Sequence, residues 1–136
     1  MAQLGFRPFP RAESTAAVNE ATMLVMMLES PQAIDNADAM AALPGVDVLL
    51  IGTNDLSLEM GIPGQYDDPR IVQVYDTVVA ACKRHGKYPG MGGIYDHPTM
   101  EKYVKRGARF ILCGADVSFI MAGGQARAEF LRGIKT

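Results

Sequence analysis

Two carboxylates in this sequence each follow an apolar stretch, and their placement indicates chemistry. Glu29 comes directly after the apolar run 23–28, and Asp55 lies just beyond the run 46–52. Neither is explained as a helix cap, because Ser30 is the better cap beside Glu29 and no helix is expected directly after Asp55. A carboxylate at the end of a buried strand is costly unless a cation or hydrogen-bond donors compensate it.

Two interpretations of Glu29 and Asp55 stay open at this point. Neighbouring parallel strands lie about 4.8 Å apart, so carboxylates at their carboxyl ends can share one ion. Two carboxylates plus waters are typical ligands of Mg²⁺ or Mn²⁺, and they leave positions for substrate oxygens. The alternative is hydrogen bonding within loops. Asp96 and Asp116 also follow apolar runs, but they stand where helix N-caps belong, and capping is the favoured interpretation for both.

An alternation of apolar strands and amphipathic helices must position these side chains. Short, fully apolar runs are typical of strands covered on both faces, and most are followed here by a cap residue, a proline and apolar residues at helical spacing. The expected strands are 23–28, 46–52, 88–94 and 109–114. The expected helices begin at Ser30-Pro31, Asp68-Pro69, Asp96-His97-Pro98 and Asp116, the last running to Arg132 with an interruption at Gly123-Gly124.

This pattern predicts an α/β fold with a parallel sheet and right-handed crossovers. Residues 23–136 form four βα units, (βα)4, which could make a small open sheet or half of a (β/α)8 barrel. Residues 1–22 are expected to be an irregular lead-in, because Pro8 and Pro10 disfavour a regular helix there.

The composition fits one globular domain without strong charge. The chain has 136 residues, of which 49% are hydrophobic, enough for one modest core. The net charge is −2 with both signs interspersed, which does not indicate a nucleic-acid or anionic-membrane partner. No apolar run reaches the ~18 residues of a membrane span, and residues 1–15 lack the apolar core of a secretory signal. A cytoplasmic protein is therefore expected.

Residues 23–64, MLVMMLESPQAIDNADAMAALPGVDVLLIGTNDLSLEMGIPG, closely resemble the metal-binding segment of the HpcH/HpaI aldolases. The shared motif is E-[ST]-x-x-[AG] after an apolar strand, followed by GVD-x-x-x-[IV]-G-x-x-DL-[SA]. The stretches HGKYPG at 85–90 and YVKRGARFILCGAD at 103–116 agree with the family as well. Its members are class II pyruvate aldolases that act on 4-hydroxy-2-oxo acids and on substrates of the 2-dehydro-3-deoxyglucarate type.

The resemblance implies a TIM barrel that binds one divalent cation, Mg²⁺, Mn²⁺ or Co²⁺. By motif position Glu29 and Asp55 are the metal ligands, and the turn after Gly52 presents the backbone amides of Asn54 and Asp55 to the carboxylate of pyruvate. The implied reactants are pyruvate or another 2-oxo acid and an aldehyde, joined or separated through a pyruvate enolate. Family members usually carry Pro-Ala or Pro-Ser where this chain has Thr53-Asn54, a departure that bears on substrate preference rather than on the metal role.

The resemblance also implies that this chain is the C-terminal half of a barrel. Its four βα units match strands five to eight, whereas a full barrel typically has about 250 residues. The family's catalytic Arg, and a His paired with an Asp, belong to the first four units. No residue here corresponds to them, and Arg7 and Arg11 are not assigned the role, so the catalytic residues are unknown from this sequence. The half could be natural, cloned or released by proteolysis.

A half-barrel leaves two strand edges and one sheet face without a cover. Val25, Met27, Val48, Leu50 and Ile111 are expected on that face, so we expect a homo-oligomer or pairing with a separate N-terminal half. Two alternatives to an active aldolase stand beside it. One is a half-barrel that binds metal, and pyruvate or oxalate, without turnover. The other is a related lyase or decarboxylase that acts on oxaloacetate or an acyl-CoA.

Overall fold

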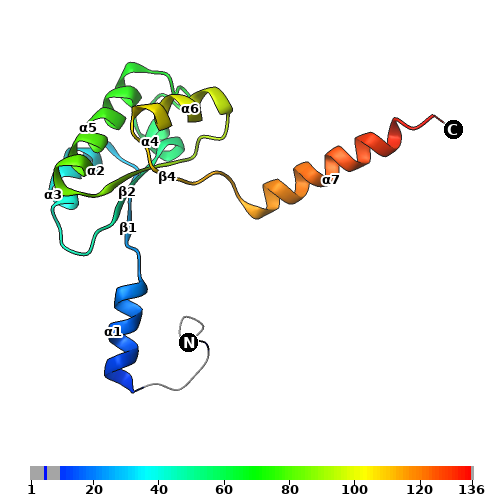
Figure 1. Ribbon diagram of the computed structural model, residues 1–136. Helices are drawn as coiled ribbons and strands as arrows, with labels where there is room; N and C mark the ends of the chain where they lie inside the picture. The colour runs from blue at the N-terminus through cyan, green and yellow to red at the C-terminus, as the bar shows by residue number, and fades with distance from the viewer. Residues whose placement is uncertain (1–4, 6–9, 136) are drawn as a thin grey trace.

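The predicted α/β class with a parallel sheet is confirmed. The computed structural model describes Gly5 and residues 10–135, and its strands form one parallel sheet in the order β1-β2-β3-β4 (Figure 1). Ile51 pairs with Leu28 on one side and with Met91 on the other, so the strands end at a common edge. The strands are β1 (Val25–Leu28), β2 (Val48–Gly52), β3 (Tyr88–Gly92) and β4 (Phe110–Ile111).

A layer of helices packs on one face of this sheet (Figure 1). Their buried side chains join Leu49, Ile51 and Met91 in a single apolar cluster, in which Tyr75 and Tyr103 are the largest fully buried members. The single helix expected after Ser30 is divided at Asn36 into two short ones. The helices of this layer are α2 (Pro31–Asp35), α3 (Ala37–Ala41), α5 (Pro69–His85) and α6 (His97–Arg106).

Helix caps mark most of the predicted helix starts. Ser30, Asp68 and Asp96 each accept a hydrogen bond from a backbone amide of the first helical turn, at 2.8–3.2 Å. Capping is therefore confirmed for Asp96. The same prediction is wrong for Asp116, which is the first residue of its helix, while the N-cap position belongs to Ala115.

Two expectations about the ends of the chain are wrong. The lead-in contains a helix, α1 (Arg11–Ala21), and Pro10 stands at its N-cap, so this proline precedes the helix instead of preventing it. Pro8 lies outside the described residues. The last helix, α7 (Asp116–Arg132), passes through Gly123-Gly124 without interruption. Glycine lowers helix stability by only about 1 kcal/mol per residue, which the rest of a 17-residue helix can compensate.

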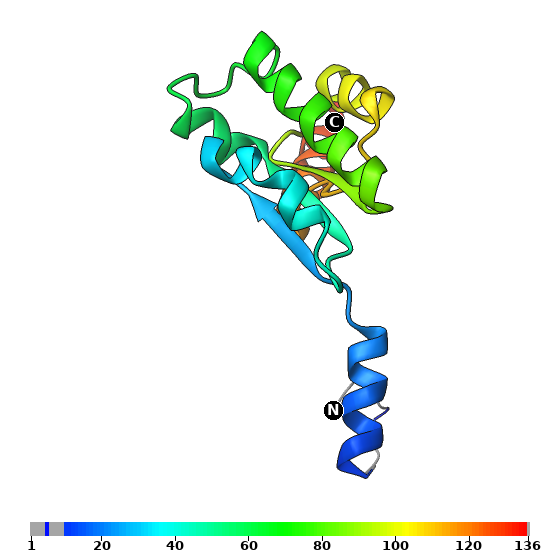
Figure 2. The same ribbon diagram turned by 90° about the vertical axis from the view of Figure 1, so that its left-hand side faces the viewer.

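Helices α1 and α7 extend away from the sheet and its helix layer (Figure 1), and Figure 2 shows the same for α1. Neither has a buried residue. No helix among the described residues has the length and hydropathy needed to cross a membrane. Several apolar side chains of α7 are nevertheless more than half exposed: Val117, Phe119, Ile120, Met121, Phe130 and Leu131.

The face of the sheet opposite the helix layer, here called the open face, is partly covered by its own side chains. Leu50 is buried there because it lies over Gly90, where an added β-carbon would fall 2.9 Å from the Leu50 Cδ1. Met27 remains 51% exposed. Ile111 was expected on this face, but it pairs with Met91 and packs against the helix-side core, so that expectation is wrong.

Candidate functional site

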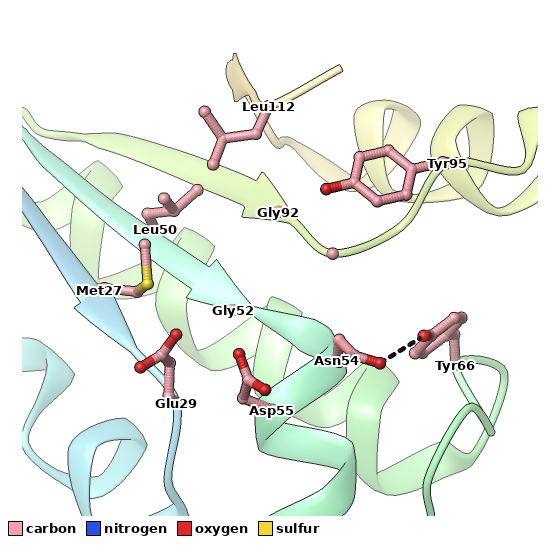
Figure 3. A pocket seen from close by; sticks show the side chains of 11 residues that line it. Met27, Glu29, Leu50, Gly52, Asn54, Asp55, Tyr66, Gly92, Tyr95 and Leu112 are labelled. Carbon is pink, nitrogen blue, oxygen red and sulfur yellow. Dashed lines mark hydrogen bonds between the residues drawn. The ribbon is translucent and has the colours of Figure 1, made fainter. Parts of the chain in front are cut away.

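A cavity of about 470 Å³ lies at the carboxyl ends of the strands (Figure 3). Its apolar side is the open face of the sheet, where Met27, Leu50 and Leu112 line it. Its polar side is formed by residues that follow the strands, at the edge where the sequence predicts chemistry. These polar side chains are Glu29, Asn54, Asp55, Tyr66 and Tyr95.

Glu29 and Asp55 line this cavity from neighbouring elements. Glu29 follows β1 directly, Asp55 follows the end of β2, and Figure 3 shows both side chains reaching into the space between the two elements. Gly52 makes this arrangement possible, because a β-carbon at that position would fall 2.7 Å from the Cγ of Glu29 and 2.9 Å from its Oε1. The structure thus brings together the two carboxylates that the sequence singles out.

Asp55 lies in a short helix that the sequence pattern did not reveal. This helix, α4 (Thr53–Glu59), begins directly after Gly52 and has Asp55 in its first turn, so the expectation of no helix there is wrong. An acidic residue is favoured in that turn by the helix dipole, and the first backbone N–H groups of a helix have no partner within it. The signal was weak: Leu56 and Met60 show helical spacing, but seven residues are fewer than a periodicity test needs.

Asn54 is held through both its side chain and its backbone. The Tyr66 hydroxyl donates a hydrogen bond to Asn54 Oδ1 at 3.2 Å, and the Ser57 hydroxyl donates to the Asn54 carbonyl at 2.7 Å (Figure 3 shows the former). Gly93 packs against the same residue, since a β-carbon on it would fall 2.8 Å from the Asn54 nitrogen. Tyr66, on the loop before α5, is a cavity residue that no spacing in the sequence indicates.

Thr53 is held from behind by the helix layer. Its hydroxyl and the Tyr75 hydroxyl are 2.7 Å apart, and both residues are fully buried. The Tyr75 ring stacks on Tyr103, with ring centroids 3.7 Å apart and planes at 19°. Burial raises the pKa of Tyr75 well above its ordinary value and raises the pKa of Tyr103 to about 12, so both hydroxyls stay protonated at neutral pH.

The donor atoms of the cavity suit a hard divalent cation. Glu29, Asp55 and the Asn54 amide present oxygen atoms, which Mg²⁺ and Mn²⁺ prefer. Among the residues that the structure describes, no group of three or more His, Cys, Asp or Glu side chains is arranged to hold a metal. A cation here would therefore complete its coordination with water or substrate oxygens, as Mg²⁺ commonly does.

The two histidines lie away from this carboxylate pair. His85 Nε2 is 3.0 Å from Asp38 Oδ1 on the helix layer, and His97 begins α6 without lining the cavity. Of the described residues that do line the cavity, none is Arg, Lys or His. The described part of the chain therefore places carboxylates at the cavity but no cationic side chain.

The chain belongs to the HpcH/HpaI aldolase/citrate lyase family, which matches residues 5–122. It is 39% identical over 117 residues to a 4-hydroxy-4-methyl-2-oxoglutarate aldolase of Hapsidospora irregularis, covering 85% of this chain and 43% of that protein. It is 32% identical over 114 residues to a 5-keto-4-deoxy-D-glucarate aldolase of Salmonella arizonae, covering 84% of this chain and 44% of that protein.

A solved structure shows the same relationship. The HpcH/HpaI aldolase from Desulfitobacterium hafniense superposes with a TM-score of 0.77 at 28% sequence identity, over 96% of this chain and 50% of that one. The family resemblance inferred from the motif is thereby confirmed. The chain spans less than half the length of the two curated relatives, both of which are aldolases.

Proposed function

We propose that this chain supplies the metal- and 2-oxo-acid-binding part of a divalent-metal-dependent aldolase. The proposal rests on one observation: Glu29 and Asp55 line the same cavity at the carboxyl edge of a parallel sheet. Membership of a family whose matched relatives are aldolases for hydroxylated oxo acids supports it. The substrate class is a 4-hydroxy-2-oxo acid, cleaved to pyruvate or another 2-oxo acid and an aldehyde.

The described residues have distinct roles in this proposal. Glu29 and Asp55 hold Mg²⁺, Mn²⁺ or Co²⁺ through their oxygen atoms. Such a cation, when bound, polarises the keto oxygen of a 2-oxo acid and stabilises the negative charge that develops as the neighbouring carbon–carbon bond breaks. The backbone N–H groups of Asn54 and Asp55, at the start of α4, donate to the substrate carboxylate. Leu50 and Leu112 form the apolar side of the cavity.

The proposal extends to the architecture: the four βα units are half of a TIM barrel that a second copy, or a separate N-terminal half, completes. β1 and β4 are the edges of the sheet, and Met27 and Leu112 beside them are 51% and 39% exposed.

A second candidate function is binding of the cation and the 2-oxo acid without turnover. It is favoured by the cavity itself, because none of its described lining residues is Arg, Lys or His. Without such a side chain, the described part of the cavity has no cationic group to balance the negative charge of a 2-oxo acid and no histidine to carry a proton near neutral pH. In an active assembly these groups come from the partner that completes the barrel.

Deuterium exchange into the methyl group of pyruvate, followed by ¹H NMR with and without Mg²⁺, tests both candidates without knowledge of the aldehyde. The proposed aldolase gives Mg²⁺-dependent exchange that Glu29→Gln and Asp55→Asn abolish. Glu101→Gln is the matched control, because Glu101 is an exposed carboxylate on α6 that pairs with Lys105. Metal binding without exchange favours the second candidate. Unchanged metal binding in both Glu29→Gln and Asp55→Asn overturns the assignment of the site.

A further inference from the structure

Thr53 and Asn54, which precede Asp55 in α4, each form a hydrogen bond with a tyrosine hydroxyl. Thr53 and Tyr75 form a fully buried hydrogen bond of 2.7 Å. Asn54 accepts a hydrogen bond of 3.2 Å from Tyr66, as Figure 3 shows. The first turn of α4 is therefore held from two directions, by the helix layer behind it and by the loop that lines the cavity.

The two tyrosines belong to one connected unit. Tyr103 of α6 stacks on the Tyr75 ring, and its hydroxyl donates a hydrogen bond to the backbone carbonyl of Tyr66. Tyr66 lies on the loop between α4 and α5, and Tyr75 lies within α5. A displacement of either tyrosine would consequently disturb the other, because Tyr103 joins them.

α4 depends on tertiary contacts for the direction in which it starts. The helix has only seven residues, and helices of that length are marginal without tertiary contacts. Its N-cap is Gly52, which supplies no side-chain hydrogen bond. Its first residue is Thr53, at a position where proline is favoured because its ring fixes φ. The hydrogen bonds to Thr53 and Asn54 add to the burial of Leu56 in fixing this turn.

We propose that Tyr66 and Tyr75 are positioning residues for the Glu29–Asp55 pair. By holding Asn54 and Thr53, they set the direction in which the Asp55 carboxylate leaves α4 and the orientation of the first backbone N–H groups of that helix. Neither tyrosine needs to touch the cation. This inference rests on the proposed function insofar as Asp55 is a metal ligand, but the geometry that it describes exists without the cation.

The buried hydrogen bond between Thr53 and Tyr75 stays intact near neutral pH. Tyr75 is fully buried, and its raised pKa keeps the hydroxyl protonated far above neutrality. Removal of that hydroxyl in Tyr75→Phe keeps the ring, and with it the stacking on Tyr103. Thr53 then retains only a long contact of 3.5 Å to the Ile51 carbonyl. The variant therefore removes the hydrogen bond that orients α4 with little change in core volume.

The first test is Mn²⁺ binding, measured from the electron paramagnetic resonance signal of free Mn²⁺. We expect Tyr66→Phe and Tyr75→Phe each to weaken Mn²⁺ binding about fivefold, the effect of losing one hydrogen bond. Tyr88→Phe, an exposed tyrosine at the start of β3, controls for the loss of a hydroxyl. Cys82→Ala, at a buried position within α5, controls for a general loss of stability. Neither control is expected to change Mn²⁺ affinity.

A double variant separates positioning from simple stabilisation. Thr53→Val with Tyr75→Phe removes both partners of the buried bond, and replacement of both by apolar groups of similar shape is nearly neutral for stability. We expect its melting temperature to return toward that of the parent while Mn²⁺ affinity stays reduced. Recovery of both would show that the bond only stabilises the fold, and would overturn the inference.

Amide hydrogen exchange provides a readout that does not depend on the metal. In Tyr66→Phe and Tyr75→Phe the amides of α4 should exchange several times faster than in the parent, while those of α6 stay unchanged. Unchanged exchange in α4 overturns the inference whatever the metal affinities are. If the parent itself binds no Mn²⁺, the metal assignment in the proposed function fails, and the exchange rates still decide whether the tyrosines hold α4.

Discussion

A β-carbon placed on Gly52 would fall 2.7 Å from the Cγ of Glu29, closer than two unbonded carbon atoms can approach. The φ angle of Gly52 is −80°, which any residue adopts, so this glycine is required for space and not for backbone conformation. Glu29 lies across the end of β2 only because position 52 has no side chain. The distance between the carboxylates of Glu29 and Asp55 therefore depends on a residue that contributes no donor atom.

The substitution Gly52→Ala should accordingly weaken cation binding without removing either carboxylate. We expect the Glu29 side chain to be displaced and Mn²⁺ affinity to fall about tenfold or more, the range seen when a supporting residue of a metal site is lost. Isothermal titration calorimetry measures this directly. Gly123→Ala is the matched control, because a β-carbon there meets nothing within 4 Å. A Gly52→Ala variant with parental Mn²⁺ affinity would show that cation binding does not depend on the space that Gly52 leaves for Glu29.

Cation binding should also stabilise the folded chain. A ligand that binds only the folded state at 100 times its dissociation constant raises the free energy of unfolding by about 2.7 kcal/mol. We expect saturating Mn²⁺ to raise the melting temperature by several degrees and EDTA to reverse the increase. Asp55→Asn should show neither effect. An equal increase in Asp55→Asn would place the bound Mn²⁺ at some other site.

The two cysteines should react at very different rates. Cys82 is buried in α5 and Cys113 is exposed after β4. Burial raises the pKa of the Cys82 thiol from 9.0 to about 11, which also removes its reactive thiolate near neutral pH. We expect a disulfide reagent to modify Cys113 within seconds to minutes at pH 8 and Cys82 only after unfolding. Rapid modification of both thiols would contradict the packing of α5.

The same pKa shift predicts a change of stability with pH. The Cys82 pKa is higher in the folded state, so the folded state holds this proton more tightly than the unfolded state does. Its contribution to stability is complete below about pH 9 and is lost as the pH rises toward about 11. Urea unfolding of the parent and of Cys82→Ala at pH 8 and pH 11 should show a smaller loss in the variant. Equal losses would contradict a buried, neutral thiol.

The sequence predicted the elements that have cap residues at their ends and enough residues to show a periodic pattern. The start of α5 at Asp68-Pro69 and its end at His85-Gly86 agree with the structure, because a cap, a proline and a left-handed glycine act within one turn. Glu29 and Asp55 were found because a carboxylate beside an apolar run is unusual. α4 was not found, since a seven-residue helix has too few positions to show a period.

The contacts that hold the residues of the site in place could not be predicted from the sequence in the same way. The Thr53–Tyr75 hydrogen bond joins residues 22 positions apart, and the stacking of Tyr75 on Tyr103 depends on the packing of α5 against α6. A tyrosine at helical spacing indicates a core position, but the neighbouring sequence does not indicate which group its hydroxyl contacts. The need for glycine at position 52 could not be predicted either, because it depends on the side chain of Glu29, which follows the neighbouring strand.

The exposed apolar surface leads to a prediction about assembly. On α7, Val117, Ile120 and Met121 are each more than 60% exposed, and their spacing places them on one face of the helix. Apolar faces of this kind mark contact sites. We expect the chain to be a dimer or larger at micromolar concentration, by light scattering coupled to size-exclusion chromatography.

Substitutions on α7 test whether that helix contributes to the assembly. Ile120→Gln with Met121→Gln should shift the chain toward monomer and leave the melting transition of the sheet and its helix layer in place, because α7 has no buried residue. Gln125→Ala, on the same helix, removes only an exposed contact with Glu129 and should leave the assembly unchanged. A parent chain that is a monodisperse monomer of 14.7 kDa would contradict the proposal that a second copy completes the barrel. Association that persists in the double variant would instead assign the contact to the free edges of β1 and β4 and to the open face around Met27.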